Sequence, residues 1–260
     1  MSAKSDVEAK IARMFGSSGR ILVLPVDHGM ALGNVPGLDD PVELALDFLK
    51  LDGVNGILSS LPVARRLEEA GMGSDKFRIV TLDSALHGTD GRIWQVAVAK
   101  PRDVANDGCD AGKVLMAWED ELSSRARTLT LVASLLEECH QAGLPILVEP
   151  VASGPTQRLD EGEIERRELE GARIALEAGA DIIKMRVWSS AACRRFVSAC
   201  PVPVVALGGT LSGGAADVVE TIKTALDLGF RGIFVGRNIW QRPRPEGLGL
   251  METIGKAVHG

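Results

Sequence analysis

Short hydrophobic runs alternate with amphipathic stretches along almost the whole chain. Eight of these runs are rich in apolar and β-branched residues on both faces, which is typical of buried strands in a parallel sheet. They occupy residues 20–29, 54–60, 77–84, 112–118, 145–151, 181–188, 202–209 and 232–238.

Between these runs, apolar positions recur at helical spacing, and many of the stretches end at glycine, as helices often do. Examples are residues 41–53, 130–143, 161–180 and 215–229. Strands that alternate with helices predict a parallel sheet covered by helices. Eight such units in 260 residues predict a (β/α)8 TIM barrel, an α/β fold, with residues 1–260 forming one domain. A doubly wound open sheet is the alternative, but no GxGxxG follows the first run to support it.

One connection is longer than the others. Residues 87–108 are predicted to form an extended loop with a short strand, QVAVA, and a helix before the fourth barrel strand.

Composition narrows the class of protein. The chain is 45% hydrophobic and carries a net charge of -6, with no basic stripe that would favour a nucleic-acid partner. No apolar run has the length of a membrane span, and the polar start MSAKSDVEAK does not resemble a signal peptide, so we expect a cytoplasmic protein without a membrane partner. The four cysteines form no CxxC pair and are expected to be reduced.

Polar residues stand where the predicted strands end, and catalytic groups of a barrel occupy that rim. The first run ends in Asp27 and His28, the third in Asp83, the fifth near Glu149, and the sixth carries Lys184 and Arg186. These side chains are therefore expected to gather at one end of the barrel.

Lys184 lies inside an otherwise apolar run, GADIIKMRVW. Because strand side chains alternate, Lys184 and Arg186 are predicted to share a face, and Lys113 is predicted to add a third inward cation. Burial and like charges lower the pKa of a lysine, and the neutral amine attacks carbonyl carbon to form a Schiff base. The alternative is a structural lysine paired with Glu149 or Asp27.

Two glycine-rich turns follow the seventh and eighth runs, where barrels often bind phosphate. Small residues allow backbone N–H groups to approach an anion, and a helix N-terminus favours negative charge. Arg237 would add a forked cation. The alternative is that the glycines only make tight turns. The candidates are Gly208, Gly209, Ser212, Gly213, Gly214, Gly236 and Arg237.

Asp27 and Glu149 are candidates for proton transfer near Lys184, although each has a structural alternative as a turn residue or an ion-pair partner. His28 is either a core imidazole or a substrate contact. The four histidines lack the spacing of metal ligands, so neither a metal nor another cofactor is expected.

Several motifs together resemble the class I aldolases of the DeoC/LacD type, which include archaeal-type fructose-bisphosphate aldolases and tagatose-bisphosphate and sulfofructose-phosphate aldolases. They are LPVDHG, CDAGKVLMAW, LVEPV, GADIIKMRVW, GGTLSGG and GFRGIFVGRNIWQR, in order along nearly the whole chain.

The resemblance implies a role for each matching position. Lys184 corresponds to the Schiff-base lysine, Asp27 to the first-strand aspartate and Lys113 to the strand-four lysine. Glu149 corresponds to the acid/base glutamate of the tagatose-type branch. Gly209, Ser212, Gly213, Gly236 and Arg237 correspond to the phosphate loops.

Two features depart from that pattern. The archaeal-type enzymes use a strand-five tyrosine as proton donor, whereas this chain contains no tyrosine and has Pro150 in that neighbourhood. Proton transfer then falls to Glu149, a water or another group. Arg186 is also unusual, and it is a candidate to bind a second anion, whether carboxylate, sulfonate or phosphate.

The predicted function is metal-independent aldol cleavage or formation of a phosphorylated ketose. The alternatives are a thiolase-like or other carbon–carbon lyase or transferase on the same scaffold, and a non-covalent phosphosugar isomerase or epimerase. The expected partners are a phosphorylated sugar and further copies of the chain in a homo-oligomer.

Overall fold

Eight parallel strands close into a barrel in the computed structural model, which describes residues 3–154, 159–209 and 214–260. The strand order is β1-β10-β9-β8-β7-β6-β3-β2, and β1 also pairs with β2 to complete the ring. The predicted TIM-barrel fold is confirmed, since each of the eight hydrophobic runs contains or overlaps one barrel strand. The strands are β1 (Ile21–Pro25), β2 (Gly56–Ser59), β3 (Phe77–Thr81), β6 (Ala111–Trp118), β7 (Ile146–Ala152), β8 (Ile182–Met185), β9 (Val204–Leu207) and β10 (Gly232–Phe234).

Alternation along the strands separates two hydrophobic clusters. On β8, Ile182 belongs to an inner cluster that fills the barrel, whereas Ile183 and Met185 belong to the outer cluster that packs against helices. The same alternation places Lys184 on the inner side, directly beyond Ile182. Phe234 of β10 and Leu147 of β7 belong to the same inner cluster.

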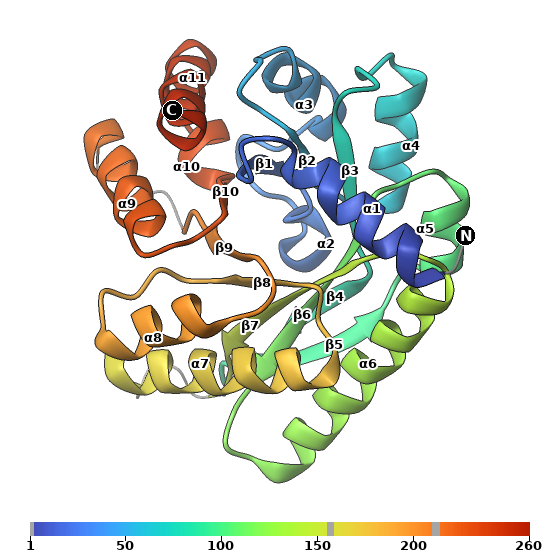
Figure 1. Ribbon diagram of the computed structural model, residues 1–260, viewed down its shortest axis with the longest axis vertical. Helices are drawn as coiled ribbons and strands as arrows, with labels where there is room; N and C mark the ends of the chain where they lie inside the picture. The colour runs from blue at the N-terminus through green and yellow to red at the C-terminus, as the bar shows by residue number, and fades with distance from the viewer. Residues whose placement is uncertain (1–2, 155–158, 210–213) are drawn as a thin grey trace.

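Helices surround the barrel, as Figure 1 shows. Asp40 caps α3 (Pro41–Leu49), the helix before β2, by accepting hydrogen bonds from the backbone N–H groups of Val42 and Glu43. Gly179, with φ of 106°, ends the long helix before β8 in the left-handed conformation that glycine favours. The larger outer helices are α3 (Pro41–Leu49), α4 (Leu61–Glu69), α6 (Leu122–Gln141), α7 (Glu161–Ala178), α8 (Ala191–Ala199), α9 (Ala215–Asp227) and α11 (Arg244–His259).

One further helix, α1 (Ala3–Phe15), lies across the barrel in Figure 1. Its Met14 and Phe15 belong to the same cluster as the inward residues of the strands, and Ile11 packs against that cluster. Helix α1 therefore closes the amino-terminal end of the barrel, opposite the strand ends that carry the polar residues.

The long connection before the fourth barrel strand is more regular than the sequence predicted. It contains an antiparallel hairpin, β4 (Asp83–His87) and β5 (Ile93–Ala97), followed by α5 (Pro101–Asn106). The predicted strand and helix are present. Residues 83–87 differ from the prediction, which ended the third run at residue 84 and began a loop at residue 87, because they form β4, the partner strand of β5. The hairpin turns at residues 88–91, where Gly91 has φ of 82° and Asp90 accepts a hydrogen bond from Arg92 N.

Two short helices, α2 (Gly29–Leu32) and α10 (Arg237–Trp240), follow β1 and β10 at the polar rim. Over the described part of the chain, no helix is both long and apolar enough to cross a membrane.

Candidate active site

Two lysines and a glutamate from neighbouring strands meet inside the barrel. Lys184 Nζ of β8 lies 3.0 Å from Glu149 Oε2 of β7, and Lys113 Nζ of β6 lies 3.1 Å from the same oxygen. All three side chains are at least 88% buried. Lys184 and Lys113 point inward, as the sequence predicted, and the ion pair with Glu149 is one of the two pairings, with Glu149 or Asp27, that the sequence offered as the structural alternative for Lys184.

Two lysines share one carboxylate oxygen in this trio. Burial works against the charged form of Glu149, but Lys113 and Lys184 outweigh it and lower the pKa of Glu149 to about 2. Burial also works against the charged form of Lys113, but Glu149, Asp83 and Asp27 raise the pKa of Lys113 above its usual value. Glu149 is consequently a carboxylate at neutral pH and Lys113 is an ammonium group.

Lys184 also faces an aromatic ring. Its Nζ lies 5.2 Å from the ring centre of Phe234 on β10. Phe234 is fully buried, so the amine lies between the Glu149 carboxylate and an apolar wall. An amine that is hydrogen-bonded to a carboxylate and shielded from bulk water is suited to attack a carbonyl carbon.

Asp83 supports the trio from the start of the hairpin. Its Oδ1 accepts a hydrogen bond of 3.0 Å from Leu115 N, and its Oδ2 accepts one of 2.9 Å from Gln95 Nε2. Burial raises the pKa of Asp83, an effect that Lys113 opposes. Asp83 thus joins the hairpin to the strand that carries Lys113.

Asp27 and His28 occupy the turn between β1 and α2. Asp27 Oδ1 lies 3.7 Å from His28 Nδ1, which is buried and has no hydrogen-bond partner within the described residues. Burial lowers the pKa of His28, and the nearby charges of Lys184 and Arg237 act in the same direction, while Asp27 opposes them. The turn therefore presents a carboxylate and a neutral imidazole near the lysines.

Arg186 does not follow Lys184 into the barrel as strand alternation predicted. Strand β8 ends at Met185, and Arg186 Nη2 lies 3.3 Å from Glu168 Oε1 of α7. Glu168 is 1% exposed, and its other oxygen accepts a 2.9 Å hydrogen bond from Trp188 Nε1. The guanidinium of Arg186 also lies 5.0 Å from the centre of the Trp188 ring, so it is held in place at the rim.

The predicted phosphate glycines have different structural roles. Gly208 N donates to Phe234 O within the barrel, and a Cβ at this position would lie 2.8 Å from Val235 Cα. Gly208 is thus required by packing, and its amide is already used. Gly209, with φ of 66°, has open space where a Cβ would be. Ser212 and Gly213 lie outside the described residues.

Gly236 and Gly214 are also accounted for by local structure. A Cβ on Gly236 would lie 2.9 Å from Pro25 Cγ and 3.1 Å from His28 Cε1, so glycine here allows β1 and β10 to approach. Gly214 N donates to Asp217 Oδ2 over 2.8 Å, so the N-terminus of α9 is capped by its own carboxylate. The expected use of that helix end for an anion is therefore weakened.

A cavity of about 480 Å³ opens at the exits of β8, β9 and β10 and continues between the barrel and α9. Its polar lining includes Arg186 and Arg237 on either side of Gly208 and Gly209. Arg186 belongs to the described lining of this cavity, whereas Lys184, two positions earlier, does not.

Further polar side chains support these groups. Asn238 Nδ2 donates to Gly208 O over 2.6 Å and so ties the two glycine turns together. Gln95 and Glu168 were not predicted, because their partners are distant in the sequence and no local pattern indicates these contacts.

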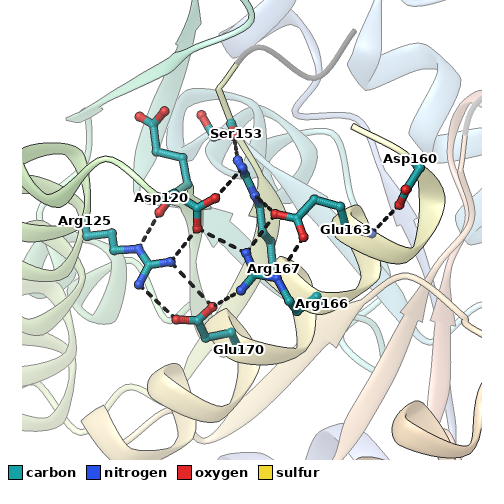
Figure 2. A network of polar contacts seen from close by, with 9 residues as sticks. Asp120, Arg125, Ser153, Asp160, Glu163, Arg166, Arg167 and Glu170 are labelled. Atoms are coloured by element: carbon teal, nitrogen blue, oxygen red, sulfur yellow. Dashed lines mark hydrogen bonds and ion pairs between the residues drawn. The ribbon is translucent and has the colours of Figure 1, made fainter. Parts of the chain in front are cut away.

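A polar network at the exits of β6 and β7 is a further addition, shown in Figure 2. Arg167 of α7 is 92% buried in its side chain and donates to Ser153 O over 2.7 Å, to Asp120 over 2.7 Å and to Glu163 over 3.0 Å. Arg125 of α6 also pairs with Asp120. The network fixes the ends of the two strands that hold Lys113 and Glu149.

Among the described residues, no group of three or more histidine, cysteine or carboxylate side chains is arranged to hold a metal ion. The cysteines are not paired with one another: Cys109, Cys139 and Cys193 are buried thiols, and Cys200 is half-buried.

Comparison with known proteins decides the family. The profile of the DeoC/LacD family aldolases matches residues 21–242, which is most of the chain. The chain belongs to the DeoC/LacD aldolase family. It is thus an enzyme of the aldolase type, as the motifs of the sequence implied.

Among the relatives of this DeoC/LacD aldolase, the 2-amino-3,7-dideoxy-D-threo-hept-6-ulosonate synthase of Halobacterium salinarum is 27% identical, over 96% of this chain and 91% of that protein. An aldolase of Saccharolobus solfataricus is 24% identical over 97% and 94% of the two chains.

A solved archaeal fructose 1,6-bisphosphate aldolase superposes with a TM-score of 0.82 at 23% identity, over 98% of this chain and 99% of that one. A second structure of similar likeness holds the catalytic lysine of that protein bound covalently to the carbinolamine intermediate of its substrate. At this identity, these superpositions establish the shared fold.

Proposed function

We propose that the protein is a class I aldolase that cleaves or forms a phosphorylated ketose through a Schiff base on Lys184. The observation that carries this proposal is the buried contact between Lys184 Nζ and Glu149 Oε2 in a barrel of the DeoC/LacD family. Of the three buried charged groups of the trio, Lys184 is the amine next to both a base and an apolar wall.

The first step is attack of the Lys184 amine on the ketone carbon of the substrate. The neutral amine is the form that attacks, and one of its protons passes to the former ketone oxygen to give a carbinolamine, while Glu149 Oε2 orients Nζ. Since Lys113 keeps its charge, it holds Glu149 in place through the second contact to Oε2. Loss of water from the carbinolamine gives an iminium ion.

The iminium ion then accepts the electron pair of the carbon–carbon bond that breaks. A carboxylate, Glu149 or Asp27, takes the proton from the C4 hydroxyl group, the C3–C4 bond breaks and the aldehyde leaves. The remaining enamine is protonated at C3, and water hydrolyses the resulting iminium to free the ketone product and restore Lys184. Aldol addition runs through the same steps in reverse, which agrees with the name synthase carried by the Halobacterium relative.

Trapping the intermediate tests this function. The protein is incubated with dihydroxyacetone phosphate and sodium borohydride, and the modified peptide is identified by mass spectrometry. We expect one reduced adduct on Lys184, loss of the adduct in Lys184→Met, and loss of cleavage of phosphorylated ketoses by at least about 10³-fold in that variant.

A matched control is Lys50→Met, which removes an exposed lysine of the surface and should change neither result. Turnover that persists in Lys184→Met without an adduct in the wild type would instead indicate a non-covalent isomerase or epimerase.

A further inference from the structure

Two arginines reach one cavity from opposite sides of β9. Arg186 follows β8 and Arg237 follows β10, and β8 and β10 are the two neighbours of β9 in the barrel. The turn between them begins with Gly208 and Gly209, and all four residues line the 480 Å³ cavity. The cavity thus has a guanidinium on each side of a glycine turn.

Arg186 is fixed in this position by two neighbours. Glu168 is almost fully buried and uses one oxygen for Arg186 and the other for Trp188, while the Trp188 ring lies against the guanidinium. Because the side chain of Arg186 is still 46% exposed, part of its donor set faces outward from this support. A guanidinium held this way loses little conformational freedom when it binds a ligand.

Arg237 has an unused donor. Its Nε is buried and has no hydrogen-bond partner among the described residues, although a buried N–H normally has one. The one carboxylate of the described lining, Asp217, already accepts from Gly214 N. Arg237 therefore adds to the cavity wall a guanidinium group with an unsatisfied N–H.

We propose that Arg186 binds the phosphate of the substrate together with Arg237, whose place in the phosphate loops the family resemblance already implies, as a two-arginine clamp on either side of Gly208 and Gly209. Arg186 then contributes to phosphate affinity itself, and does not read a second anion elsewhere on the substrate. The placement of both arginines on one cavity carries this assignment. It deepens the proposed function, because it takes the cavity to be the phosphate end of the substrate site.

Phosphate binding measures the clamp without any chemistry at Lys184. Inorganic phosphate is titrated into the wild type, Arg186→Gln and Arg237→Gln by calorimetry. Charge-assisted hydrogen bonds of this kind change affinity by about 10- to 100-fold, so each variant should weaken phosphate binding by at least about tenfold. Arg195→Gln, which removes an exposed arginine from α8, is the matched control and should bind as the wild type does.

A pair of sugar ligands separates one anion from two. Fructose 1-phosphate and fructose 1,6-bisphosphate are compared as inhibitors of borohydride trapping, and Arg186→Gln should lose affinity for both by the same factor. A loss confined to the bisphosphate would assign Arg186 to a second anion and overturn the clamp. Unchanged phosphate binding in Arg186→Gln, or no phosphate binding by the wild type, would overturn it as well.

Arg186→Lys provides a second variant if the glutamine variant does not fold. It keeps the charge that faces Glu168 but lacks the forked donors, and it should still weaken phosphate binding. The clamp and the Schiff base fail independently. Absence of an adduct on Lys184 with intact phosphate effects would reject the aldolase chemistry only, whereas an adduct without an Arg186 effect would reject the clamp only.

Discussion

At the residue scale, the site rests on a single carboxylate oxygen that serves two lysines. Glu149 Oε2 lies about equally far from Lys113 Nζ and Lys184 Nζ, at 3.1 Å and 3.0 Å. The two amines differ in their surroundings, because Asp83 and Asp27 add negative charge near Lys113. In the proposed mechanism, the same residue type therefore serves two purposes in one buried trio, with Lys113 as a fixed charge and Lys184 as the nucleophile.

Replacing Lys113 with methionine tests the role of the fixed charge. Burial raises the pKa of Glu149 and the two lysines lower it, so removal of one lysine leaves a higher pKa. In the proposed mechanism Glu149 acts in its base form, which exists above that pKa, so the acidic limb of the kcat/KM–pH profile should move upward by about 1–3 pH units.

The matched control for this measurement is Lys50→Met, whose profile should overlay that of the wild type. An acidic limb that stays in place in Lys113→Met would show that another group serves as the base.

At the element scale, the β4–β5 hairpin supports the barrel strand that carries Lys113. Gln95 of β5 donates to Asp83 Oδ2 and to Leu115 O, and its Oε1 accepts from Ala117 N over 3.0 Å. One side chain thus connects both hairpin strands to β6. Position and charge at the site consequently depend on an element outside the barrel.

Gln95→Leu should detach this connection and leave Asp83 and the β6 backbone groups unsatisfied. We expect the free energy of unfolding, measured with urea, to fall by about 1–3 kcal/mol. Gln141→Leu, which alters an exposed glutamine on α6, is the control and should cost less than about 0.5 kcal/mol. Equal losses in the two variants would mean that the hairpin contacts do not contribute to stability.

Much of the site could be predicted because side chains alternate between the inner and outer faces along the whole length of a strand. The rule ends where the strand ends. It placed Lys113, Glu149 and Lys184 on the inner face, but β8 ends at Met185, so the rule no longer applied to Arg186. Gln95 and Glu168 contact partners at least 12 residues away in the sequence, and nothing in their own neighbourhood marks those contacts.

Two elements were not predicted, α1 and the hairpin strand β4. They differ in how clearly the sequence marks them. Helix α1 carries an apolar face at Val7, Ile11 and Met14, a helical spacing that is visible in the sequence. The first hairpin strand was less visible, because Asp83 and His87 stand at its ends and its pairing with β5 depends on the turn between them.

At the scale of the whole molecule, the chain ends by packing onto its own early loops. His259 Nε2 of α11 lies 3.0 Å from Gly53 O in the loop before β2, and Gly255 of the same helix faces Gly53. A Cβ on Gly53 would lie 2.9 Å from Gly255 Cα, so the two backbones approach as closely as glycine allows. This contact joins the last helix to the loop that leads into β2.

Gly53→Val should separate these backbones and lower the free energy of unfolding by about 1–3 kcal/mol, since the opposing atom is backbone and cannot turn away. Gly249→Ala is the matched control on α11, because its Cβ has open space. It should raise stability by about 0.5–1 kcal/mol through helix propensity. Thermal unfolding of both variants measures the two opposite shifts, and a neutral Gly53→Val would refute the close packing.

The trio sits on three strands that hydrogen-bond directly to one another, whereas Arg186, Arg237 and the glycine turns sit just past the strand ends. Under the proposed function, bond formation and ligand selection therefore fall to separate parts of the polypeptide. Exchanging rim segments for those of a related enzyme should change which sugar is accepted while leaving the reactive amine in its setting, so this scaffold is suited to engineering of new carbon–carbon bond formations.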